Sequence, residues 1–145
     1  MSVALDQGVR LSFPGDRVYL SAVREFVREL LESARDGDPF TERDLCEIQL
    51  AIQEACVNAI RHGNGDDAAK PVGLRIAIAP DRVAFRVSDE GPGFDLAQIS
   101  LPGENEPREG GYGLAILRRT MEDVRVERNG DGASISFWRR RGADR

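Results

Sequence analysis

EACVNAIRHG, at residues 54–63, is the stretch that says most about the fold of this chain. It lies inside a segment with helical periodicity, and it places a carboxylate four residues before an amide. Four residues turn a helix by about 400°, so Glu54 and Asn58 project from one face. A carboxylate can take up a proton and an amide oxygen can bind Mg²⁺, as a metal–nucleotide site requires. Any solvated helix face could also show this pair, so its meaning depends on the rest of the chain.

Two glycine-rich segments follow this helix. DEGPGF, at residues 89–94, comes directly after the apolar run at 83–87, and GGYGL, at residues 110–114, opens a helical run. A carboxylate at the end of a strand can accept a hydrogen bond from an exocyclic amine, and glycines let backbone pass close to a flat base. Glycines before a helix leave its first N–H groups and positive dipole end open to a phosphate. Taken singly, the segments would equally fit a turn and a flexible helix start.

The order of these three segments resembles the GHKL family of ATP-binding domains, which includes histidine-kinase catalytic domains, gyrase and MutL. EACVNAIRHGN, DEGPGFD, EGGYGLAIL and MEDVRV are most similar to the anti-sigma factor serine kinases of the RsbW and SpoIIAB type. The resemblance extends from Val9 to Trp138. It implies an α+β fold, namely the two-layer α/β sandwich called the Bergerat or GHKL fold, with helices on one face of a mostly antiparallel mixed sheet.

The resemblance also implies roles for individual residues in a site for ATP and Mg²⁺. Glu54 would be the catalytic base that orients or deprotonates a serine hydroxyl, and Asn58 would bind both the nucleotide and the metal. Asp89 would accept a hydrogen bond from the adenine N6 amine. The other nucleotide-binding candidates are Gly91, Gly93, Arg108, Gly110, Gly111 and Gly113. Arg108 could reach a phosphate, although a solvated position in the ATP lid at residues 95–109 suits it better. His62 would pack or hydrogen-bond near the phosphates without a catalytic role.

The remaining patterns predict a compact order of elements within one domain, residues 1–145. We expect a strand at 9–13, a helix that follows Asp16 and runs to about Ser33, and a helix from Glu42 towards His62 after the N-cap Thr41. Strands at 72–79 and 82–88, a helix at 112–121, and a hairpin of strands at 124–127 and 133–138 should follow. Glu54, Asn58 and His62 should form a polar strip beside the apolar stripe of the second helix. Residues 139–145 are predicted to be a frayed tail.

Composition limits the environment and the partners. The formal net charge of -5 argues against nucleic acid as a direct partner. The N-terminus lacks a secretory pattern and no apolar run is long enough to span a membrane, so we expect a cytoplasmic protein. Cys46 and Cys56 lie too far apart along one helix to form a disulfide.

The function that the resemblance implies is that of an ATP-dependent protein serine kinase and anti-sigma factor. Such a protein sequesters an alternative sigma factor and phosphorylates a STAS-domain anti-anti-sigma protein on serine. A homodimer is compatible with the apolar positions of the first helix. Two alternatives stay open: a non-catalytic nucleotide-binding module that switches partners, and a related kinase acting on a regulator other than sigma. A complete sensor histidine kinase is disfavoured, because the single histidine lies inside the 54–63 stretch.

Overall fold

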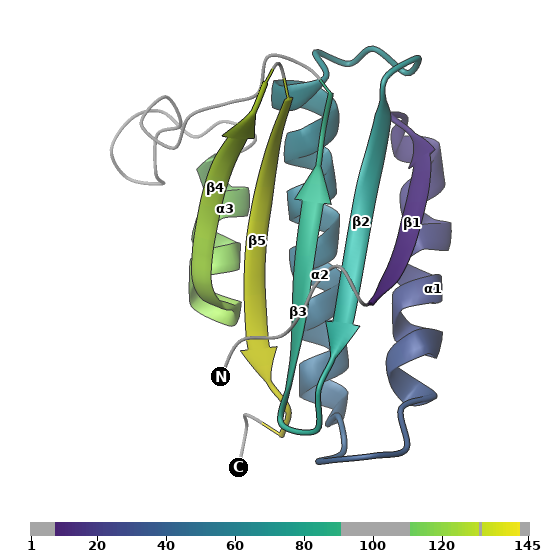
Figure 1. Ribbon diagram of the computed structural model, residues 1–145, viewed down its shortest axis with the longest axis vertical. Coiled ribbons are helices and arrows are strands. Elements are labelled where there is room, and N and C mark those ends of the chain that lie inside the picture. Colours follow the sequence, from purple (N-terminus) through teal and green to yellow (C-terminus); the bar gives the residue numbers. More distant parts are fainter. Residues whose placement is uncertain (1–7, 91–110, 131, 143–145) are drawn as a thin grey trace.

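The computed structural model describes residues 8–90, 111–130 and 132–142, which form an antiparallel sheet with helices on one of its faces (Figure 1). The strands are β1 (Val9–Pro14), β2 (Pro71–Ile78), β3 (Arg82–Ser88), β4 (Glu122–Asn129) and β5 (Gly132–Arg140). The helices are the 3₁₀ turn η2 (Arg17–Tyr19), α1 (Leu20–Glu32), α2 (Glu42–Asn58), the π turn η3 (Ala59–Gly63) and α3 (Gly111–Thr120). The predicted α+β sandwich is confirmed.

The strands lie in the order β1-β2-β3-β5-β4, and every pairing between neighbours is antiparallel. The sheet was expected to be mixed, but its described strands contain no parallel pair. Side chains alternate across the sheet, so Val83 and Phe85 of β3 are buried under the helices while Arg86 and Ser88 point the other way. We call the side without helices the open face; it is turned towards the viewer in Figure 1.

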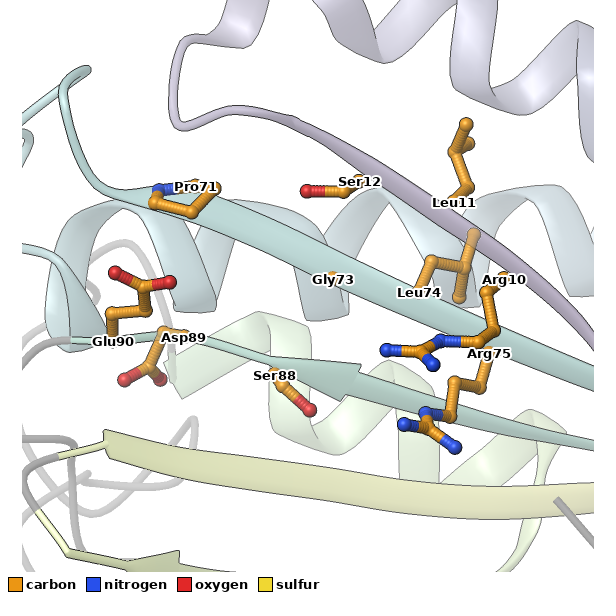
Figure 2. Close-up of a pocket in the computed structure, with 10 residues that line it drawn as sticks. All are labelled: Arg10, Leu11, Ser12, Pro71, Gly73, Leu74, Arg75, Ser88, Asp89 and Glu90. Atoms are coloured by element: carbon orange, nitrogen blue, oxygen red, sulfur yellow. The ribbon is translucent and has the colours of Figure 1, made fainter. Parts of the chain in front are cut away.

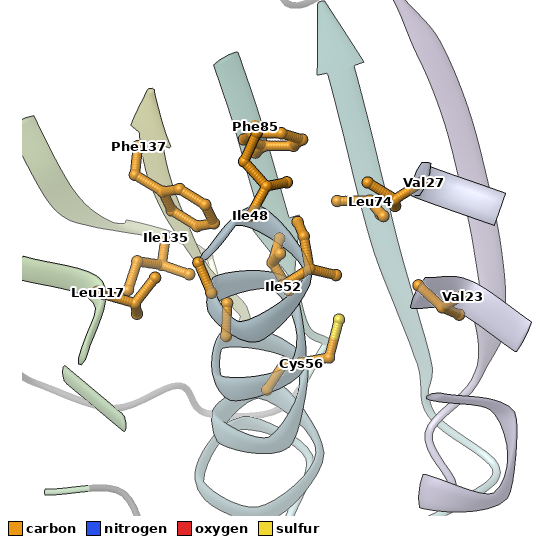
Figure 3. Packing of buried hydrophobic residues seen from close by; sticks show 14 of the residues in the cluster. Val23, Val27, Ile48, Ile52, Cys56, Leu74, Phe85, Leu117, Ile135 and Phe137 are labelled. Atoms are coloured by element: carbon orange, nitrogen blue, oxygen red, sulfur yellow. The ribbon is translucent and has the colours of Figure 1, made fainter. Parts of the chain in front are cut away.

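The core lies between α2 and the sheet. Helix α2 is central because Ile48, Ile52 and Cys56, at helical spacing, are all fully buried (Figure 3). Ile48 lies beside the rings of Phe85 and Phe137, whose centroids are 5.5 Å apart. Helix α1 contributes Val23 and Val27 on one side and α3 contributes Leu117 on the other. None of the helices in the described part of the chain is long and apolar enough to cross a membrane.

Helix α2 does not continue to His62 as an α-helix. It ends at Asn58, and the following π turn η3 is closed by the Asn64 N–H, which donates to the Ala59 carbonyl five residues earlier at 2.8 Å. A wider turn rotates later side chains out of the α-helical register. His62 is consequently exposed, whereas Asn58 is buried, and the predicted polar strip does not extend past Asn58.

The C-terminal residues up to Gly142 are ordered, so the predicted frayed tail is wrong for 139–142. Arg139 and Arg140 belong to β5, and the side chains of Arg139 and Arg141 are buried. Arg139 donates from Nε to the buried Asp44 carboxylate at 3.0 Å, which explains why a tail of arginines folds back onto α2. Residues 143–145 lie outside the described part of the chain.

Candidate nucleotide site

Four of the predicted site residues lie where α2 and β3 end and α3 begins. Glu54 and Asn58 lie in the last turns of α2, Asp89 directly follows β3, and Gly113 lies in the first turn of α3. Gly111 is the first residue of α3. The sheet thus brings together residues that are 59 positions apart in the chain, from 54 to 113. Gly91, Gly93, Arg108 and Gly110 lie outside the described residues, and their roles stay predictions.

Asn58 is the most unusual residue of this site. Its side chain is 1% exposed, and neither its Oδ1 nor its Nδ2 has a hydrogen-bond partner among the described residues. A buried polar group left unpaired costs about 1–3 kcal/mol, so its presence needs an explanation. The amide oxygen is a hard ligand of the kind that Mg²⁺ takes, and the amide as a whole can also bond a nucleotide. An orphaned buried amide beside Glu54 therefore fits both groups.

Gly113 lets α3 approach α2 at these side chains. A Cβ atom added to it would lie 3.0 Å from Glu54 Oε2 and 3.7 Å from Asn58 Nδ2. The close contact places the first turn of α3 beside the carboxylate and the amide. Because the N-terminus of a helix attracts anions, a phosphate group held at this end would lie near both side chains.

Asp89 is held in a fixed position. Its backbone N–H donates to the Ala133 carbonyl at 2.9 Å, and the Ala133 N–H donates to Asp89 Oδ1 at 3.2 Å. On the other side, a Cβ at position 63 would come within 2.1 Å of Asp89 Oδ2, so only glycine leaves room for the carboxylate. A rigid acceptor that is 8% exposed is suited to a directional hydrogen bond with an amine of a bound base.

Sequence reasoning missed two residues that support Asp89. Gly63 is needed for space and not for backbone conformation, since its φ is not positive. Asn64 is 2% exposed and connects three segments: its Nδ2 donates to the Lys70 carbonyl at 3.0 Å, and its Oδ1 accepts from the Glu90 N–H at 2.9 Å. Gly63-Asn64-Gly65 is typical of a surface turn, and no local signal distinguishes it from one.

Cys56 lies between Glu54 and Asn58 in the chain but takes no part in the site. It points into the core, and burial raises the pKa of its thiol to about 12. The thiol therefore stays neutral at physiological pH and is a small apolar residue of the core.

The chain is similar to known proteins over most of its length. The profile of the family described as "Histidine kinase-like ATPase domain" matches residues 13–138. The serine-protein kinase RsbW of Bacillus subtilis is 30% identical over 137 residues, which cover 89% of this chain and 82% of the relative. The RsbW of Bacillus velezensis is 28% identical over 145 residues, which cover 94% of this chain and 87% of that protein.

Solved structures show the same fold. The crystal structure of the RsbU and RsbW domains of a Mycobacterium tuberculosis protein matches with a TM-score of 0.65 at 20% identity, over 92% of this chain and 32% of that one. The mycobacterial sensor histidine kinase MprB matches with a TM-score of 0.53 at 16% identity, over 92% of this chain and 98% of that one. At these identities the likeness concerns the fold.

Proposed function

Because this chain belongs to the histidine kinase-like ATPase family and, within it, to the RsbW-type serine-protein kinases, we propose that it transfers the γ-phosphoryl group of ATP to a serine of a partner protein. The observation that carries this proposal is the buried Asn58 amide, whose two polar atoms lack partners among the described residues, next to Glu54. A fold does not need such an amide, whereas a Mg²⁺-nucleotide site does.

Each residue has a defined task in this proposal. Asp89 accepts a hydrogen bond from the adenine amine, and its fixed geometry favours adenine over guanine. Asn58 is the protein ligand of Mg²⁺, which when bound neutralises the charge of the phosphates. Glu54 orients the serine hydroxyl and accepts its proton. Phosphoryl transfer depends mainly on positioning and charge, so a site with few side chains is sufficient.

We further propose that this kinase acts as an anti-sigma factor in the cytoplasm. It would bind an alternative sigma factor in one state and a STAS-domain anti-anti-sigma protein in the other, phosphorylating the latter on serine. The support is the similarity to RsbW over most of both chains. A ligand shifts such an equilibrium only as far as its affinities for the two states differ, so the bound nucleotide can select the partner.

A homodimer is part of the proposal. Val18, Tyr19 and Phe26, in η2 and α1, are 74%, 42% and 36% exposed, and apolar side chains gathered on one helical segment favour association. Sedimentation velocity of the wild type and of Phe26→Glu tests it. A wild type that sediments as a monomer at micromolar concentration would contradict the dimer.

The kinase proposal is tested by phosphate transfer from labelled ATP with Mg²⁺ to STAS-domain proteins of the source organism. Wild type should label one serine, and Glu54→Gln should lose about 10²–10⁴-fold in rate while still binding ATP. Glu25→Gln, an exposed acid of α1, is the matched control and should be unaffected. Nucleotide binding without transfer to any candidate would favour the non-catalytic partner-switching module.

A further inference from the structure

The open face of the sheet carries a row of arginines. Arg10 of β1 lies opposite Arg75 of β2, and Arg75 lies opposite Arg86 of β3. Within the described residues, no carboxylate forms an ion pair with any of the three. Like charges placed directly opposite each other destabilise a sheet. The arrangement is unexpected in a chain with a net charge of -5, where acidic residues are abundant.

A row of small residues runs beside the arginines. In register across four strands it consists of Ser12, Gly73, Ser88 and Ser134. Arg10 and Arg75 line one end of a hollow of about 330 Å³ over β1, β2 and the end of β3, together with Ser12, Gly73 and Ser88. Its other end is acidic and is lined by Asp89 and Glu90. Figure 2 shows the Arg10 and Arg75 guanidinium groups extending in the same direction, towards the part of the sheet where Gly73 and Ser88 lie.

Gly73 is not explained by the fold. Its φ is not positive, and a Cβ atom added to it would meet only Ser88 Cβ, at 3.9 Å. A glycine inside a strand weakens the sheet and often marks the place where a ligand or another backbone comes close. Two unfavourable features, the arginine row and this glycine, therefore occupy neighbouring positions of one surface. A shared cause is a bound partner.

We propose that this surface, made of Arg10, Arg75 and Arg86 with Ser12, Gly73 and Ser88, docks an acidic polypeptide segment of a partner protein. The carboxylates pair with the arginines, the peptide backbone passes over Gly73, and the two serine hydroxyls bond to it. The row spans about 10 Å, two interstrand distances, which is longer than a single phosphate and suits several residues of extended chain.

The net charge of the protein favours a short acidic peptide over nucleic acid as the ligand of this surface. A net charge of -5 repels the dense charge of nucleic acid, while a short acidic peptide meets the local basic row. The arginine row lies on the opposite side of the sheet from α2 and α3, so an occupant held by it would leave Asn58 accessible. The far end of the hollow, at Asp89, belongs to the proposed nucleotide site. This inference is independent of phosphoryl transfer and holds even if Glu54 is not a catalytic base.

Fluorescence anisotropy with a labelled hexaglutamate peptide at low salt tests the docking surface, with hexaglutamine as the neutral control. Wild type should bind hexaglutamate and not hexaglutamine. Arg75→Ala should weaken binding about tenfold, the loss expected for one charge-assisted contact. Gly73→Leu should weaken it similarly without any change of charge, because it fills the hollow. Arg35→Ala, at an exposed arginine outside the sheet, should bind like wild type.

Arg75→Glu gives a second measurement that moves in the opposite direction. It should abolish hexaglutamate binding and yet raise the melting temperature on the order of 2–4 °C, since it places a carboxylate between two arginines. Equal losses in Arg75→Ala and Arg35→Ala would overturn the proposal. A lower melting temperature in Arg75→Glu would overturn it too. If wild type does not bind the peptide and Arg75→Glu loses a dimer that wild type forms, the face is an interface with a second copy of this chain.

Discussion

The two ends of α2 differ in how their buried polar groups are hydrogen-bonded. At the N-terminal end, Thr41 and Asp44 form a reciprocal capping box, with Thr41 Oγ1 accepting from the Asp44 N–H at 2.9 Å. The fully buried Asp44 carboxylate also accepts from the Gly142 N–H at 2.7 Å and from Arg139 Nη2 at 2.9 Å. Arg139 in turn bonds Glu47 at 2.8 Å. Both Asp44 oxygens therefore have partners.

At the C-terminal end the helix widens into a π turn and buries the Asn58 amide without a partner among the described residues. This difference distinguishes a polar group that is buried to stabilise the fold from one that is buried to bind a ligand. A polar group that stabilises the fold is surrounded by protein donors and acceptors, whereas one that awaits a ligand is left incomplete. Four experiments can break or sharpen this contrast.

The largest effect on stability is expected from Asp44→Ala, at the N-terminal end of α2, where the buried carboxylate has hydrogen-bond partners. Removing this carboxylate leaves Arg139 buried with the half-buried Glu47 as its one counter-charge among the described residues, so the free energy of unfolding should fall by about 3–5 kcal/mol in urea titrations. Glu32→Ala, which removes an exposed partner of Arg28, should lose far less. A loss for Asp44→Ala as small as for Glu32→Ala would mean that the C-terminal end of β5 does not depend on Asp44.

Two asparagines a short distance apart allow a matched comparison at the other end. Asn64→Ala breaks three hydrogen bonds and should lower the free energy of unfolding by about 2–3 kcal/mol. Asn58→Ala breaks none among the described residues, so its stability should equal or exceed that of wild type, while calorimetry should find Mg-ATP affinity reduced at least about tenfold. Equal destabilisation by both substitutions would show that Asn58 is structural.

Acid should reduce the stability that Asp44 contributes at the N-terminal end of α2. Burial raises the pKa of Asp44, but hydrogen bonds from Thr41, Gly142 and Arg139 outweigh it and hold the pKa below its ordinary value of 3.8. The unfolded chain then takes up the proton more readily, so this contribution to stability is complete above about pH 4 and is lost as pH falls through the folded-state pKa. Urea titrations from pH 6 downwards should show a steeper loss in wild type than in Asp44→Asn.

The smallest effect is expected in the rates at which the two cysteines are alkylated. Cys46, towards the N-terminal end of α2, is exposed, whereas Cys56, near the C-terminal end, is buried with its pKa raised to about 12. Iodoacetamide at neutral pH should modify Cys46 in the folded protein and reach Cys56 only when the helix opens. Mass spectrometry with and without Mg-ATP checks this. Rapid modification of Cys56 in the folded protein would contradict the tight packing between Glu54 and Asn58.

Local patterns predicted most elements because the spacing of apolar residues reflects which face is buried. The helix containing Glu54 and Asn58 was placed correctly, and the structure brings both next to Gly113. The tail was misplaced because Arg139 and Asp44 are 95 residues apart in the sequence, and a run of arginines looks solvated until its partner is known. Gly63 was also missed, since what makes it necessary is the carboxylate of Asp89, which follows β3 and is distant in the sequence.

The π turn fixes how many residues the chain can have between Asn58 and Asn64. Deleting one residue from Ala59–Gly63 would let the α-helix continue, and every later residue would rotate by about 100° around the axis. Gly63 would then no longer face Asp89, and Asn64 would lose Glu90 and Lys70 together. Within this turn Gly63 leaves no room for a side chain beside the Asp89 carboxylate, and the length of the turn is constrained as well, because the contacts of Gly63 and Asn64 depend on their register.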